Sequence, residues 1–129
     1  MKAERHRQIA ERIERSVALC HDDDWEIQIE AAMLAGTHWA NYALHQHGVA
    51  MEDEDIVHTS MLVVNTVRKY KIVEADLITA LEEIEELRPL YVRGDVDGGP
   101  EAGRRALDLL GTIAAQARKS DEFARRRLS

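Results

Sequence analysis

The chain has 129 residues and a mass of 14.6 kDa, which is the size of one domain with one hydrophobic core. Hydrophobic residues make up 45% of it and charged residues 32%, a balance that excludes a disordered acidic tail. Because it contains no run of about 18 apolar residues, we expect no membrane partner. The formal charge of −7 argues against coating of DNA, which needs many Lys and Arg side chains facing phosphates. Only two prolines and seven glycines, with 5% aromatic residues, indicate an all-α protein.

Apolar residues at helical spacing predict a first helix over about residues 2–20, with Ile13, Val17 and Cys20 on one stripe. Its start alternates charged with single apolar residues and lacks the continuous apolar stretch of a secretory signal. Cys20, the one cysteine, cannot form an internal disulfide, and its place on the stripe favours a core position. These features predict a cytoplasmic protein.

A second helix is predicted from Trp25 to His47. Asp23 followed three residues later by Glu26 resembles a capping box, and Gly48 fits the glycine that follows a helix end. Apolar residues lie on nearly every face, which is typical of a buried central element. Small residues recur every four positions and would let a neighbouring helix approach closely: Ala32, Gly36 and Ala40.

The acidic run 52–55 predicts the positive N-terminal end of a third helix, with its apolar face over residues 56–70. A fourth helix follows Lys71 and carries its apolar row up to Leu87. Pro89 should move Arg88 away from helical geometry, so that this helix kinks or ends there.

The glycine- and aspartate-rich segment 93–99 predicts a flexible loop, and Gly99-Pro100 opens a fifth helix that runs to Lys119. Residues 120–129 form a basic tail that we expect to be loose. The predicted fold is therefore one domain over residues 1–129 with its core over about 2–119, an all-α up-and-down four-helix bundle with an additional fifth helix.

Polar side chains gather on the otherwise apolar second helix. His38 and His45 are seven residues apart and share a face with Asn41 and Tyr42, while His58 is placed at the start of the third helix. We interpret these five residues as the lining of a groove that contacts a ligand or a partner.

A metal site is not indicated. Metal-binding bundles use paired Glu-x-x-His motifs, and the one near match is Asp55-x-x-His58. The acidic run 22–24 lacks the spaced oxygen ligands and the turn glycine of a calcium loop. No Gly-rich phosphate loop, GxSxG elbow or HExxH pair is present, so we assign no metal and no cofactor.

Two segments, Ala-Leu-His-Gln-His-Gly-Val at 43–49 and Asp-Ile-Val-His-Thr at 55–59, resemble the HEPN (higher eukaryotes and prokaryotes nucleotide-binding) superfamily. In that superfamily an alanine-rich second helix ends in a His-Gly-Ile-like turn, and a histidine opens the third helix soon afterwards. The later Leu-Arg-Pro-Leu-Tyr-Val-Arg at 87–93, the loop after it and the alanine-rich helix 101–119 are similar too. The resemblance covers about residues 25–119.

The resemblance implies an up-and-down bundle, usually a homodimer, that partners a minimal nucleotidyltransferase, binds nucleotide or RNA, or acts as a metal-independent ribonuclease. The ribonuclease members carry Arg-x(4–6)-His near their late helices, whereas His58 is the last histidine of this chain. Arg15 and His21 have that spacing, but at the end of the first helix. The non-ribonuclease type is therefore favoured.

Three hypotheses follow. The first is a HEPN-like binding module, without catalysis of its own, that contacts a nucleotide or a nucleotidyltransferase-type partner. The second is a ribonuclease or toxin-like enzyme in which Arg15 and His21 act and the basic ends hold RNA. Those ends carry net charges of +2 (residues 1–20) and +4 (residues 104–129), against −13 between them. The third is a structural homo-oligomeric bundle, favoured by the row of small residues.

Overall fold

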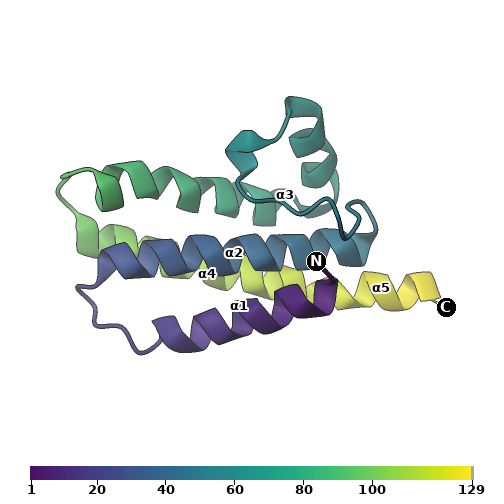
Figure 1. Cartoon of the computed structure of the whole chain (residues 1–129), viewed down its shortest axis with the longest axis horizontal. Helices are drawn as coiled ribbons and strands as arrows, with labels where there is room; N and C mark the ends of the chain where they lie inside the picture. Colours follow the sequence, from purple (N-terminus) through teal and green to yellow (C-terminus); the bar gives the residue numbers. More distant parts are fainter. Residues whose placement is uncertain (129) are drawn as a thin grey trace.

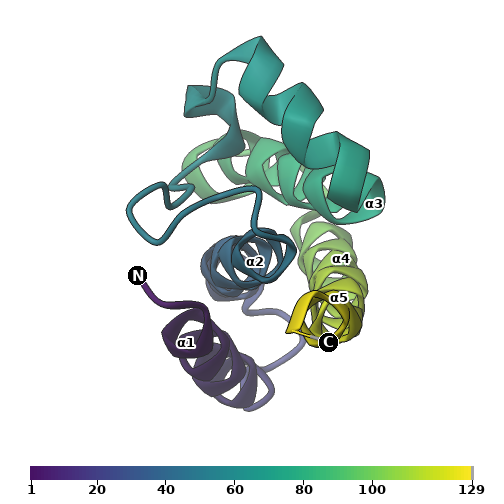
Figure 2. The same ribbon diagram turned by 90° about the vertical axis from the view of Figure 1, so that its right-hand side faces the viewer.

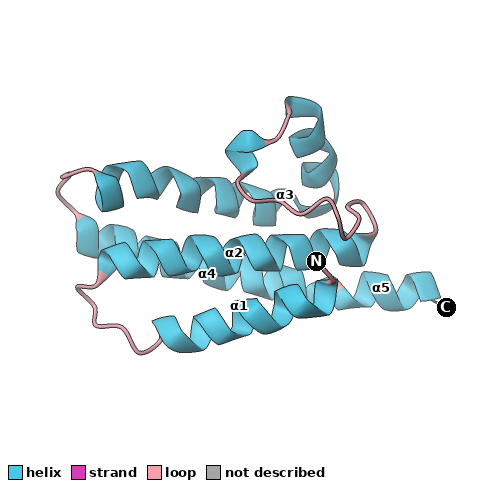
Figure 3. Cartoon of the chain, in the orientation of Figure 1, coloured by secondary structure: helices cyan, strands magenta, loops and turns pink. Residues whose placement is uncertain are grey.

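Helix α2 (Trp25–His47) lies at the centre of the structure, a computed structural model that describes residues 1–128. Three helices pack against it: α1 (Ala3–Val17), α3 (Val64–Arg88) and α4 (Gly99–Lys119). Figure 2 looks along α2 and shows α1 on one side of it and α3 and α4 on the others. The predicted all-α bundle and its central second helix are confirmed, and residues 1–128 contain no strand (Figure 3).

The core is built around α2 because that helix has buried residues on every side. Ile29, Trp39 and Leu44 are fully buried, and full burial of such a side chain stabilises the fold by roughly 1.5–3 kcal/mol. Gly36 explains the close approach of the neighbours: a Cβ atom there would lie 3.3 Å from the terminal methyl groups of both Leu81 and Ile113. The row of small residues thus serves packing within one chain.

The start of α2 differs in detail from the prediction. Asp24, and not Asp23, is the residue that precedes the helix, and its side chain does not cap it. The Asp24 carboxylate instead accepts a hydrogen bond from the backbone N–H of His21, which closes the turn between α1 and α2. Cys20 lies beyond the end of α1 and is half-buried, so its predicted core position is wrong.

The predicted third helix begins later than its acidic run indicated. Residues 51–58 form a loop, a single 3₁₀ turn follows over Thr59–Met61, and α3 starts only at Val64. The expected third and fourth helices are one element with a break at Glu74, whose φ of −143° and ψ of 61° are not helical. The Glu74 carboxylate lies 2.8 Å from His47 Nε2, so the break lets it pair with the end of α2.

Pro89 ends α3 as predicted, but Arg88 keeps helical angles and the chain continues through a π-helical turn, Pro89–Arg93. Gly98, at φ 99°, precedes α4, and Pro100 lies in the first turn of that helix, as expected. The tail differs from the prediction, because residues Asp121–Leu128 form helix α5; residue 129 lies outside the described residues. None of the helices described over 1–128 combines the length and apolar character that crossing a bilayer requires.

Candidate functional site

The start of α1 lies beside the end of α2, and the loop after α2 folds back over both (Figure 1). Gly48 permits this reversal, since its φ of 73° is in the left-handed region that favours glycine. Asn41 then holds the returning chain: its Nδ2 donates to the carbonyl of Ile56 at 2.9 Å, and its Oδ1 accepts from the N–H of Ile56 at 2.7 Å. Asn41 is therefore a buried clamp for the loop, and its amide is already paired with Ile56.

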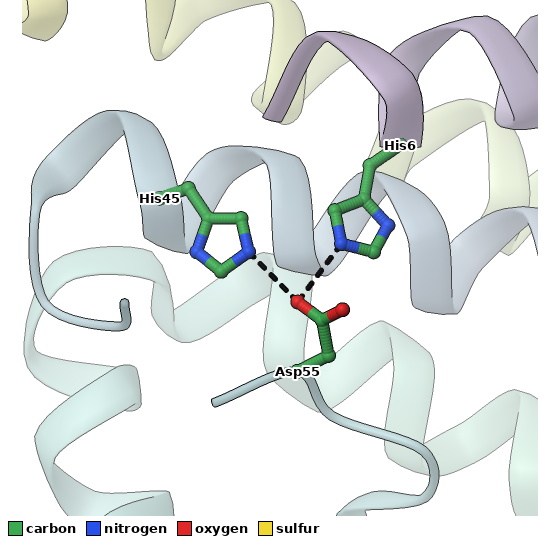
Figure 4. A group of neighbouring side chains, drawn as sticks. All are labelled: His6, His45 and Asp55. Atoms are coloured by element: carbon green, nitrogen blue, oxygen red, sulfur yellow. Dashed lines mark hydrogen bonds and ion pairs between the residues drawn. The ribbon is translucent and has the colours of Figure 1, made fainter. Parts of the chain in front are cut away.

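Four side chains meet where these segments converge, and we call His6, His38, His45 and Asp55 the histidine cluster. Asp55 Oδ1 lies 2.9 Å from His6 Nε2 and 2.8 Å from His45 Nε2, as Figure 4 shows. His6 Nδ1 lies 2.9 Å from His38 Nδ1, and His45 Nδ1 lies 2.8 Å from the carbonyl oxygen of Ala50. Asp55, expected to cap a helix, instead joins α1 to α2.

Burial and hydrogen bonding shift the pKa values within the histidine cluster. Burial lowers the pKa of His6, although its hydrogen bond to Asp55 acts in the opposite direction. Burial and the neighbouring His6 lower the pKa of His38. Burial alone would raise the pKa of Asp55, but hydrogen bonds from the terminal ammonium group, His6 and His45 lower it to about 2. At neutral pH the cluster therefore combines an ionised carboxylate with neutral imidazoles at His6 and His38.

A pocket of about 370 Å³ opens beside the cluster, and we call it the apolar pocket. Its polar lining includes His38 and His58; His38 Nε2 and the ring of His58 have no hydrogen-bond partner among the described residues. Most of its remaining lining is apolar and comes from α2 and the loop: Met33, Leu34, Ile56 and Val57. Pockets of this size and character are typical of sites for small molecules.

A second pocket, of about 270 Å³, adjoins the first, since Met33 and His58 line both; we call it the arginine pocket. Arg88 and Arg93 lie on its wall. Arg88 donates to Glu30 Oε1 at 2.5 Å, whereas Arg93 is exposed and makes no ion pair with a described residue. The carboxylate of Glu85 in the same wall is held by the N–H and hydroxyl groups of Thr59.

The structure separates the remaining predicted residues from these pockets. The hydroxyl of Tyr42 donates to Asp121 at the start of α5, away from the pocket lining. Arg15 and His21 are both exposed at the opposite end of α1, by the connection to α2, and line neither pocket. Of the five predicted groove residues, His38, Asn41 and His58 line the apolar pocket, and Asn41 is the one whose side chain is already paired with the backbone of Ile56.

Sequence reasoning missed His6, Asp55 and Arg93. A signal for His6 was present, because it precedes Ala10 by four residues and Val17 by eleven, and both are buried on the face of α1 that meets α2. Asp55 was noticed only as a helix-start residue and in the near match Asp55-x-x-His58, which pairs it with a different histidine. Its contacts depend on how the loop folds back, which no local pattern shows.

Comparisons with protein-family models, with curated proteins and with solved structures found no match to this chain. Its function is therefore inferred from the pockets and the histidine cluster.

Proposed function

We propose that the protein is a HEPN-like helical module that binds a nucleotide without catalysis of its own. The base would lie in the apolar pocket and the phosphates in the arginine pocket. One observation carries this proposal: the two pockets share Met33 and His58, so an apolar half adjoins a half that bears arginines.

The apolar pocket suits a heteroaromatic base. Met33, Leu34 and Ile56 provide apolar surface, and a base that covers them loses unfavourable contact with water. His38 Nε2 and the His58 ring supply hydrogen-bonding groups that no described residue uses. A few polar groups in an apolar lining give orientation and specificity to such a site.

The arginine pocket suits phosphate because a guanidinium group forms charge-assisted hydrogen bonds with phosphate oxygens. Glu30 and Glu85 balance part of the positive charge near Arg88. Arg93 has no such partner among the described residues, so phosphate affinity should depend mainly on it.

Nucleotide binding can be tested by titrating the protein into N-methylanthraniloyl-labelled ADP and following fluorescence anisotropy. We expect saturable binding that Arg93→Ala weakens tenfold or more, since a hydrogen bond to a charged group contributes about 1.5–3 kcal/mol. His58→Gln should also weaken it. Arg104→Ala removes another exposed arginine, on α4 and outside both pockets, and should leave the affinity unchanged. Absence of binding, or equal affinity for all of these variants, would refute the proposal.

A self-associating bundle is the second candidate, and exposed apolar residues favour it. Ile27 is 59% exposed and Leu34 51%, and their separation of seven residues places them on one face of α2. A second copy that covers this face would make the predicted homodimer. Sedimentation equilibrium of the wild type and of Ile27→Glu tests it, because a charge in such an interface should dissociate the dimer. A monomer at high concentration would exclude this candidate.

The nucleotidyltransferase partner implied by the resemblance stays a prediction. Capture of the tagged protein from its native lysate at moderate salt, with bound proteins and nucleic acid both identified, tests it. Recovery of a stoichiometric nucleotidyltransferase would support that partner, and recovery of RNA would return attention to the ribonuclease alternative.

A further inference from the structure

We propose that His6 Nε2, His45 Nε2 and Asp55 Oδ1 form a binding site for a zinc ion. These three atoms lie within 4.8 Å of one another, and both imidazole nitrogens point at the Asp55 oxygen (Figure 4). They come from α1, from α2 and from the loop between residues 48 and 58, so the site exists only when those segments are packed together. Two imidazole nitrogens and one carboxylate oxygen are a ligand set that zinc binds in proteins, with its fourth position left to water or a ligand.

The second nitrogen of each histidine supports this assignment. A metal-bound histidine almost always donates its other ring N–H to a carbonyl, a carboxylate or another acceptor, which fixes its tautomer. His45 Nδ1 lies 2.8 Å from the carbonyl oxygen of Ala50, and His6 Nδ1 lies 2.9 Å from His38 Nδ1. Both outer acceptors are thus already in place.

In its neutral form, His45 has better-satisfied contacts with a cation at the centre. Both of its ring nitrogens face oxygen acceptors, Ala50 O on one side and Asp55 Oδ1 on the other. A neutral imidazole has one N–H and can donate to only one of them. When Nε2 binds the metal, the N–H at Nδ1 donates to the carbonyl oxygen of Ala50. Asp55 Oδ1 then binds the metal and no longer competes with Ala50 for the single N–H of His45.

The contacts of Asp55 require only a small adjustment, and the two imidazole nitrogens, which lie within 4.8 Å of each other, must also come to the separation that zinc requires. Zinc bonds of about 2.0–2.1 Å in a tetrahedral site separate neighbouring ligand atoms by roughly 3.3 Å. Asp55 Oδ1 lies 2.8–2.9 Å from the two nitrogens, so it would withdraw by roughly 0.5 Å. The side chain of Asp55 is on a loop and 28% exposed, whereas those of His6 and His45 are 2% and 5% exposed, so the carboxylate is the ligand with room to move.

The apolar pocket gives the ion a path to the site, and the terminal ammonium group of Met1 leaves one oxygen of the Asp55 carboxylate for the metal. His6 and Asp55 both line the apolar pocket, through which an ion and its water can enter. Asp55 Oδ2 accepts a hydrogen bond from the terminal ammonium group of Met1 at 2.9 Å, which leaves Oδ1 as the metal-binding oxygen. His38 takes no part as a ligand here but orients His6.

Zinc binding should be measured on protein without a polyhistidine tag, after removal of metals with EDTA and dialysis, by competition with a chromogenic zinc chelator. We expect one zinc ion per chain. Asp55→Asn and His45→Gln should each weaken binding by about a hundredfold or more, and His38→Ala by about 10–100-fold, as is usual when an outer partner is lost. His21→Gln, which changes an exposed histidine outside the site, should leave the affinity unchanged.

Cobalt(II) and thermal unfolding provide independent readouts. Cobalt in the wild-type site should show the intense visible absorption of four- or five-coordination, and Asp55→Asn should abolish it. Zinc should raise the unfolding temperature of the wild type, because it binds the folded state, and should not raise that of a folded Asp55→Asn or His6→Gln protein. Equal zinc affinity of the wild type and Asp55→Asn, loss of binding in His21→Gln, or cobalt that keeps the spectrum of the free ion would overturn the proposal. His58→Gln should retain zinc, which separates this test from that of nucleotide binding.

Discussion

Asn41→Ala should destabilise the fold by about 2–4 kcal/mol, although it removes only an amide group. Asn41 is 1% exposed and Ile56 3%, and the two hydrogen bonds between them, at 2.7 and 2.9 Å, satisfy both backbone polar groups of Ile56. A buried donor or acceptor that loses its partner costs about 1–3 kcal/mol. Two such groups are left here, and water that enters the space of the lost amide should keep the total below the upper sum.

Urea unfolding followed by far-UV circular dichroism measures this loss. With an m-value of about 2 kcal/mol/M, the midpoint should fall by about 1–2 M without a change in slope. Asn65→Ala is the matched control, since Asn65 is an exposed residue in the first turn of α3, and its replacement should change stability by less than about 0.5 kcal/mol. Hydrogen exchange adds a local readout, because the amide of Ile56 should lose its protection in Asn41→Ala.

The same variant should weaken zinc binding, since the clamp at Ile56 holds the adjacent Asp55 over the two histidines. Equal midpoints for Asn41→Ala and Asn65→Ala would refute this reasoning. So would an Ile56 amide that stays protected, because the loop would then be held by something other than Asn41.

Two further predictions concern packing and titration. Gly103→Ala should destabilise the protein by about 1–2 kcal/mol, because the new Cβ would lie 2.9 Å from Trp25 Cβ and 3.1 Å from its Cα. Gly111→Ala on the same helix adds a Cβ that meets nothing within 4 Å and should stabilise the protein by up to about 1 kcal/mol. Thermal unfolding of the two variants tests this, and equal shifts of the unfolding temperature would contradict it. Burial and the hydrogen bond to Asp121 raise the pKa of Tyr42 to about 12, so the stability that depends on its neutral hydroxyl is complete below pH 10 and is lost as the pH rises from 10 to 12. Absorbance at the tyrosinate band should show a late step that Tyr42→Phe removes, and titration of every tyrosine near pH 10 in the folded protein would contradict this.

Local chemistry made several elements of the fold predictable. The run from Trp25 to His47 is apolar on nearly all sides and ends at a glycine, so both its helical state and its central place follow from its residues. Gly99-Pro100 marked the start of α4 for the same kind of reason, because proline suits the first turn of a helix. The acidic run 52–55 was misleading, since the same residues that favour a helix start also suit an exposed loop.

The candidate site depended on contacts between distant parts of the chain. Asp55 meets a histidine 49 residues away on α1 and another 10 residues away on α2, and the two pockets join residues of α2 to the end of α3. The sequence by itself determined an all-helical bundle, the central helix and the presence of three histidines on it. Only the tertiary structure decided which of them converge, because that depends on the rotation of α1 about its axis and on the path of a clamped loop. A hydrophobic pattern specifies which face of a helix is buried, but not which polar side chains meet there.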